Sequence, residues 1–180
     1  MVIFRLTLQH LQDSTVALQN AAQYVSVNGY VLIIDSCDTA HRTSHPISAI
    51  DEALQLVAEA QSSKGKGNRR ITLELLQGLE SATSPLGSLY EVVFSNLDAE
   101  GNILCDITRF EGEQNRRLFF NHGLLFLTLL HRTYQIPVDL CKGYHELKAY
   151  VADKGAWTSL GSHCLVLKRK TAAASQKTSD

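Results

Sequence analysis

The first 36 residues limit the fold more than any other part of the sequence. Residues 2–8 (VIFRLTL) and 30–36 (YVLIIDS) are apolar runs of strand length. Between them, apolar residues recur at helical spacing, from a helix start at Asp13-Ser14 to a stop at Asn28-Gly29. Two strands joined by such a helix run parallel, with a right-handed crossover. The pattern therefore predicts an α/β protein with a sheet that is covered on both faces.

The rest of the chain alternates between helical and extended patterns. We expect helices at residues 47–61, 70–80, 116–133 and 144–152. We expect strands at residues 90–97 and 163–169, with 103–110 returning onto 90–97 as a hairpin arm after the turn DAEGN. Residues 37–46 and 81–88 are polar loops in this interpretation. We expect residues 1–170 to belong to one domain, and we expect the tail 171–180, which has no core-forming residues, to be disordered.

Composition excludes several classes of partner. With 17 basic and 18 acidic side chains, the net charge of −1 gives no electrostatic basis for binding nucleic acid or an anionic membrane. Apolar runs such as GLLFLTLL are too short to span a bilayer. The N-terminus lacks the basic region of a signal peptide. The four cysteines are widely spaced, which favours reduced thiols and a cytoplasmic protein.

Several phrases share their order and spacing with one known family. They are LQHLQD at residues 8–13, Gly29 followed by the run ending in Asp35, GNRR at 67–70, and HCLVLKR at 163–169. Together they resemble the class I S-adenosylmethionine-dependent methyltransferases. The resemblance implies part of a Rossmann-like methyltransferase sheet, with family strands in the order 4-5-7-6 and the last strand antiparallel. It also implies flanking helices and an inserted helical and hairpin region within 99–157.

The glycine-rich turn of that family has no counterpart in the sequence. Glycine lets the backbone approach the cofactor closely. The string Gly65-Lys66-Gly67 lies in a polar linker between helices, where a solvated loop is expected. The chain thus resembles the C-terminal half of a methyltransferase, from the fourth strand onward. It would supply the side that binds a small-molecule acceptor and would bind S-adenosylmethionine weakly or not at all by itself. The alternative is a binding or scaffolding module without catalysis.

Candidate site residues lie where the first two strands end, because ligands of such sheets bind outside the carboxyl ends of the strands. The resemblance implies that Arg5 and Thr7 flank the methionine part of the cofactor. Either His10 or His41 could act as a base near neutral pH, although His10 could simply bond to the backbone. The residues expected to contact the acceptor are Gln9, Asp35, Asp38 and Arg42. Both aspartates could instead be turn or capping residues.

Two further patterns have structural and functional interpretations. Cys37, His41 and His45 are regularly spaced, but Pro46 breaks any helical face and a fourth ligand is not evident, so no metal site is expected. The apolar helix at 116–133 carries Phe119, Phe120 and Phe126, which suit a core. A lid over an acceptor pocket is the functional alternative.

The resemblance also makes residues 2–8 an edge strand, since family strands 1 to 3 would lie beyond it. This segment is apolar and has only one charge and no proline. Charged residues and proline usually protect an edge strand from pairing with another chain. We therefore expect residues 2–8 to be covered by a missing N-terminal half, by a protein partner or by a second copy of the chain.

Overall fold

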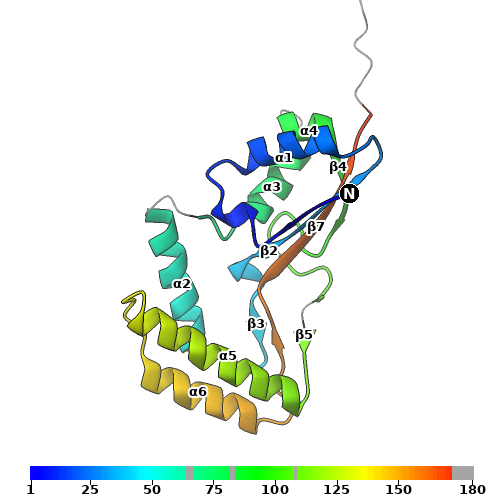
Figure 1. The fold of residues 1–180 in the computed structure, drawn as a ribbon. Helices are drawn as coiled ribbons and strands as arrows, with labels where there is room; N and C mark the ends of the chain where they lie inside the picture. Colours follow the sequence, from blue (N-terminus) through cyan, green and yellow to red (C-terminus); the bar gives the residue numbers. More distant parts are fainter. Residues whose placement is uncertain (64–66, 82–83, 108, 172–180) are drawn as a thin grey trace, which may run out of the picture.

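A computed structural model describes residues 1–63, 67–81, 84–107 and 109–171. The expected tail from residue 172 onward and the Gly65-Lys66 pair lie outside these ranges. Figure 1 shows a sheet with helices at one end of the molecule and a group of three helices at the other. The strands are β1 (Val2–Arg5), β2 (Tyr30–Ser36), β3 (Arg42–Thr43), β4 (Tyr90–Ser95), β5 (Arg109–Phe110), β6 (Thr158–Ser159) and β7 (Ser162–Arg169). The helices are α1 (Ser14–Tyr24), α2 (Ser48–Ser63), α3 (Ile71–Glu80), α4 (Pro85–Leu89), α5 (Glu113–Arg132) and α6 (Leu140–Ala152), with 3-10 turns η1 (Leu8–His10) and η2 (Asp38–Ala40).

The larger sheet has four strands in the order β1-β2-β7-β4. Strand β1 is parallel to β2, and β7 is antiparallel to both β2 and β4. The prediction of a mixed α/β protein with a mixed sheet and flanking helices is therefore confirmed. A second, three-stranded sheet, β3-β6-β5, links the larger sheet to the helical group.

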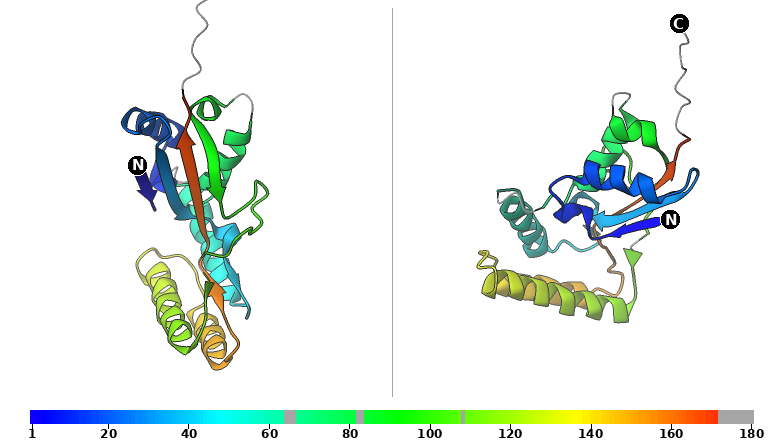
Figure 2. Two further views of the ribbon diagram at one scale, coloured as in Figure 1. Left: turned by 90° about the vertical axis from the view of Figure 1, so that its right-hand side faces the viewer. Right: turned by 45° about the horizontal axis from the view of Figure 1, so that its top comes forward.

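One face of the larger sheet is buried beneath α1, α3 and α4 (Figures 1 and 2). Alternate residues of β2 and β7, among them Ile33 and Leu165, are fully buried there against leucines of the three helices. The phenol of Tyr90 adds a buried hydrogen bond to the carbonyl oxygen of Leu18 at 2.8 Å. Each buried leucine or isoleucine contributes roughly 1.5–3 kcal/mol, so this layer accounts for much of the stability of the sheet.

The opposite face of the sheet carries an apolar row and no helix of the described chain (Figure 2). Cross-strand pairs join Ile3 to Leu32, Leu32 to Val166, and Val166 to Phe94. The row thus crosses all four strands, and its outer members Ile3 and Phe94 are 54% and 38% exposed. The expectation of a sheet covered on both faces is wrong for the described residues, because only one helical layer is present.

The first strand is shorter than predicted. It ends at Arg5, Leu6 has a φ of +50°, and the chain then turns into η1 instead of staying extended to residue 8. The cause is distant in sequence: the buried Asp35 carboxylate accepts a hydrogen bond from the Leu8 N–H at 2.8 Å. This contact turns Leu8 into the core.

The helical group has its own core between α2, α5 and α6. A Cβ on Gly143 would meet the end of the Leu127 side chain, so glycine favours the close approach of α5 and α6. Asp139 caps α6 by accepting the N–H of Lys142 at 2.9 Å. The four helices predicted after residue 36 are all present, and α5 and α6 begin three and four residues earlier than expected.

The predicted hairpin over 103–110 is wrong. Among the described residues, the arms are joined by an isolated bridge between Leu97 and Ile103 and by a hydrogen bond from the Leu104 N–H to the Asn96 carbonyl oxygen at 2.9 Å, and Arg109–Phe110 pairs with β6 instead. Two polar stretches predicted as loops contain short elements. The stretch 37–46 forms η2 and β3, and α4 begins at Pro85, where a fixed φ suits the first helical turn.

The buried His163 makes stability depend on pH. Its Nε2 atom hydrogen-bonds Ser95 at 2.8 Å, and burial lowers its pKa to about 4. In the unfolded chain this group takes up a proton near its ordinary pKa of about 6.5, so acid favours unfolding in the window between the two values. We predict a loss of about 1 kcal/mol in the free energy of unfolding between roughly pH 7.5 and 5.5 that is attributable to His163.

Urea titrations of wild type, His163→Gln and the exposed-site control His131→Gln would measure this loss. The first variant should flatten the pH dependence, whereas the control should keep it. Equal pH slopes in all three proteins would contradict a neutral, buried His163.

Candidate functional site

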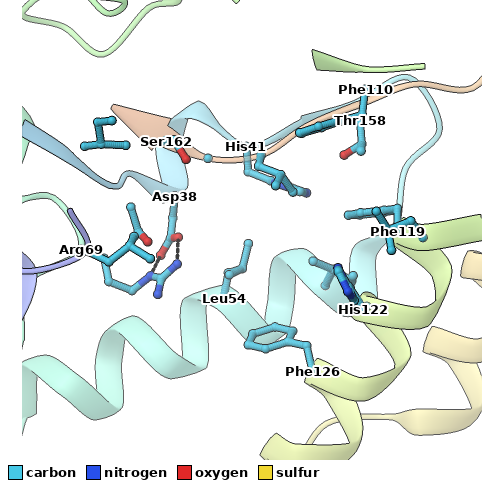
Figure 3. A pocket seen from close by; sticks show the side chains of 18 of the residues that line it. Asp38, His41, Leu54, Arg69, Phe110, Phe119, His122, Phe126, Thr158 and Ser162 are labelled. Carbon is cyan, nitrogen blue, oxygen red and sulfur yellow. Dashed lines mark hydrogen bonds and ion pairs between the residues drawn. The ribbon is translucent and has the colours of Figure 1, made fainter. Parts of the chain in front are cut away.

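A cavity of about 590 Å³ lies between the sheet and the helical group (Figure 3). Its sheet side is formed where β1 and β2 end, by Arg5, Leu6, Ile34 and Ser36. Its other walls come from α2, α5 and the segment around β6. The volume falls within the range of small-molecule sites, about 300–1,000 Å³, and the position at strand carboxyl ends is one where ligands commonly bind.

The walls opposite the sheet are mainly apolar. Leu54 projects from α2, and Phe119 and Phe126 project from α5 (Figure 3). Phe119 also packs edge-on against the buried Tyr150 ring, with centroids 5.2 Å apart, which fixes its orientation. The phenylalanines therefore divide between two roles: Phe119 and Phe126 line the cavity, and Phe120 packs against Tyr144 of α6.

His41 points into the cavity from the turn that follows η2 (Figure 3). Its ring stacks on Phe119, with centroids 6.3 Å apart and planes 25° from parallel. Its Nε2 atom is buried and has no hydrogen-bond partner among the described residues. Burial lowers the pKa of His41, an effect that the Asp51 and Asp38 carboxylates partly offset. The imidazole is thus neutral near pH 7, and its Nε2 atom is enclosed by the surrounding protein.

Asp38 forms a bidentate ion pair with Arg69, with both N–H···O distances at 2.6 Å. The two side chains are only 21% and 19% exposed, which makes this a well-ordered pair. This ion pair joins the η2 turn to residues 69–70, which precede α3. Each Asp38 oxygen accepts a hydrogen bond from Arg69, so the two side chains form a neutral pair in one wall of the cavity.

Of the residues predicted at the ends of the first two strands, the structure places Arg5, Asp38 and His41 in the lining of this cavity. Arg42 lies just outside and donates hydrogen bonds to the carbonyl oxygens of Thr39 and His41, at 2.5 and 2.7 Å. Arg42 therefore holds the turn that carries His41 and is not among the residues that line the cavity.

The other predicted residues lie away from the cavity lining. Thr7 donates to the Arg5 carbonyl oxygen at 2.9 Å, and the side chains of Gln9 and His10 bond to each other at 3.1 Å on η1. Asp35 is fully buried; burial raises its pKa, while backbone N–H groups of residues 7–9 lower it. The early end of β1 places Thr7, Gln9 and His10 at the η1 turn, which lies against α3.

Sequence reasoning missed His122, which also projects into the cavity (Figure 3). It belongs to a stripe along α5 in which Asn115, Phe119, His122 and Phe126 follow one another at intervals of four, three and four residues. Such spacing places side chains on one helical face. Two polar residues on an otherwise apolar face were the available signal.

No group of three or more histidine, cysteine, aspartate or glutamate side chains in the described ranges could hold a metal ion. Cys37 is buried and lies 3.1 Å from the Thr39 hydroxyl. His45 is turned toward Asp153, 3.9 Å away.

The electrostatic surroundings of His41 lead to a prediction about its titration. NMR should give His41 a pKa below the ordinary value of about 6.5. Asp51→Asn should lower it further, because the Asp51 carboxylate favours the protonated ring. Glu59→Gln, an exposed change on the same helix, serves as the control. A pKa of His41 at or above the ordinary value would contradict the burial described here.

None of the described helices is long and apolar enough to cross a membrane. Comparison of the sequence with known protein families finds no family that matches. Comparison with curated proteins finds no match either.

Proposed function

We propose that this chain forms the acceptor side of an S-adenosylmethionine-dependent methyltransferase that acts on a small molecule. The observation that carries the proposal is the cavity at the carboxyl ends of β1 and β2, into which the neutral His41 points. Its position is where a methyl acceptor would meet a cofactor bound beside β1.

The strand order supports the proposal. In the class I methyltransferase sheet, the seventh strand runs antiparallel between the fifth and the sixth. Here β7 lies antiparallel between β2 and β4, with β1 outside β2, so the observed order corresponds to family strands 4-5-7-6. Helices α5 and α6, which lie between β4 and β7 in sequence, correspond to the insertion that the resemblance implied, and α5 supplies one wall of the cavity.

The side chains suit methyl transfer. S-adenosylmethionine, when bound, supplies a methyl group on a good leaving group, so the protein must mainly align the acceptor and take up its proton. In this proposal His41, whose side chain lines the cavity, accepts that proton on its imidazole ring. Arg5 fits the methionine carboxylate, because it lies exposed at the rim of the cavity and forms no ion pair within the described residues. The remaining cofactor contacts would come from another segment or chain.

The alternative is a non-catalytic module that uses the same cavity only for binding. Both functions require a ligand in the cavity, but only the enzyme transfers a methyl group. An assay that follows binding and transfer separately therefore distinguishes them.

We predict that the protein purified from its native cells, with a tag added to its C-terminus, transfers labelled methyl groups from S-adenosylmethionine to small aromatic acceptors. His41→Ala should lower the rate about 100-fold or more, the usual effect of removing a general base. His131→Ala, at an exposed site on α5, should leave the rate unchanged. Ligand binding without any transfer of label would overturn the enzymatic proposal and favour the module.

The isolated chain should bind S-adenosylmethionine weakly or not at all. Sites for such cofactors surround most of the ligand, and the sequence contains no glycine-rich turn to contribute. Calorimetry with residues 1–180 measures this directly. A dissociation constant in the low micromolar range would show that this chain contains a complete cofactor site and would refute the division into two halves.

We further propose that another chain covers the β1 edge and the apolar row from Ile3 to Phe94. The Leu6 N–H bonds inward to Ile34 at 2.8 Å, and alternate N–H groups along β1 point away from the sheet. Unpaired groups beside exposed apolar residues favour pairing with another strand. In solutions of the isolated chain, the available occupant is a second copy.

We therefore predict that wild type self-associates and that Ile3→Lys shifts it toward monomer, because a charge at the edge opposes pairing. Size-exclusion chromatography with light scattering measures the mass. Val16→Lys is the matched control, since Val16 is 46% exposed on α1, over the covered face. A wild type that stays monomeric at high concentration would contradict this proposal.

A further inference from the structure

The charges that line the cavity indicate a class of ligand that goes beyond the proposed function. We infer that the cavity binds an amphipathic carboxylic acid, with its carboxylate at Arg5 and its apolar body against the helical walls. This inference depends on the cavity and on Arg5, and it does not require that the protein transfers methyl groups.

The negative charge of the ligand follows from the charges around the cavity. Among the described residues, the ionisable side chains of the lining are Arg5, Asp38, His41, Arg69 and His122. Asp38 and Arg69 neutralise each other in their bidentate ion pair, and burial lowers the pKa of His41, so its ring is neutral near pH 7. His122 can add positive charge but never negative charge. The lining therefore favours an anion, whereas a cation would find no unpaired carboxylate in it.

Arg5 is the group that can hold the carboxylate. It is the last residue of β1 and pairs with Ile34 of β2, and both side chains line the sheet side of the cavity. The Arg5 side chain is exposed at the rim and forms no ion pair with the described residues. A guanidinium group presents parallel N–H donors that match both oxygens of a carboxylate. Because the rim is open to water, the carboxylate keeps part of its hydration there.

The apolar body of the ligand follows from the opposite walls. Leu54 projects into the cavity from α2, and Phe119 and Phe126 project from α5 (Figure 3). Asn115 and His122 line the cavity from the same face of α5. They offer hydrogen bonds to polar substituents, and neither can repel an acid. An apolar body that extends from the rim to this wall leaves water and gains contacts with the leucine and the two aromatic rings.

An acid bound in this way competes with the cofactor, and this consequence rests on the function proposed above. That function assigns the methionine carboxylate to Arg5. One guanidinium edge pairs with one carboxylate at a time, so the acid and the cofactor exclude each other at this position. Amphipathic acids should therefore inhibit the proposed enzyme by competing with S-adenosylmethionine.

Equilibrium dialysis of the chain with 2-naphthoate and 2-naphthamide tests the inference, because the two probes have the same rings and differ in charge. Arg5→Gln should weaken the binding of 2-naphthoate about fivefold or more, the effect of losing a charge-assisted hydrogen bond, and should leave the binding of 2-naphthamide unchanged. Arg5→Lys should keep part of the affinity for 2-naphthoate. Arg132→Gln, at an exposed site in the last turn of α5, controls for the change in net charge and should resemble wild type.

A further variant separates loss of the charge from loss of the apolar wall. Phe126→Ala should weaken the binding of both probes, and circular dichroism verifies that each variant is folded. The inference is overturned if Arg5→Gln binds 2-naphthoate as tightly as wild type does, or if neither probe binds at its solubility limit. It is also overturned if the binding of 2-naphthoate depends on His122, tested with His122→Gln, and not on Arg5.

A methyl-transfer assay of the native protein distinguishes this inference from the proposed function. There 2-naphthoate should raise the KM for S-adenosylmethionine, whereas 2-naphthamide should not. Transfer that is unaffected by 2-naphthoate, at a concentration that saturates the chain in dialysis, supports the enzyme and overturns the placement of the acid at Arg5. Binding that depends on Arg5, combined with no transfer of methyl groups, overturns the proposed enzyme and leaves the ligand class standing.

Discussion

The pairing of β2 with β7 is the interaction on which the rest of the structure depends. It extends from Tyr30 opposite Lys168 to Ser36 opposite Ser162 and joins the start of the chain to its end. Beyond the last pair, the Cys37 N–H donates to the carbonyl oxygen of Gly161 at 2.8 Å. A Cβ on Gly161 would lie 2.6 Å from the Cys37 carbonyl oxygen, so glycine is required for this approach. The close contact between Cys37 and Gly161 places the turn that carries His41 beside β6, and the cavity lies next to this turn.

Around this central pair of strands, helices of the described chain cover only one face of the larger sheet. The α1, α3 and α4 layer buries Ile33 and Leu165, while the row from Ile3 to Phe94 on the other face remains partly exposed. Sheets with parallel strands are normally covered on both faces, because their strands are apolar on both. An exposed apolar row across a whole sheet is therefore a surface with an energetic reason to be covered, and it adjoins the edge strand that lies beside the cavity.

Local patterns in the sequence sufficed for the helices and for the main strands, because periodicity and end signals act within a few residues. These local patterns gave wrong predictions where a contact with a residue distant in sequence determines the local structure. Leu8 leaves the strand because Asp35 accepts its N–H, and Arg109 pairs with β6 instead of returning to β4. The residues that line the cavity also differ in whether local sequence patterns could predict them. Arg5, Asp38 and His41 could be predicted from strand ends, whereas His122 comes from a helix whose position depends on the packing of α2, α5 and α6.

The polar side chains near the cavity differ in how completely their hydrogen bonds are satisfied. Asp38 has both oxygens bonded to Arg69, and Arg42 donates to two carbonyl oxygens, so each is explained by the turn that it holds. His41 is positioned by that same turn, yet its buried Nε2 has no partner. A buried nitrogen without a partner costs about 1–3 kcal/mol. His163 Nδ1 and Asp35 Oδ1 are also buried without a partner among the described residues, so this property alone does not distinguish a functional group from a structural one. His41 differs from these two because its side chain lines the cavity.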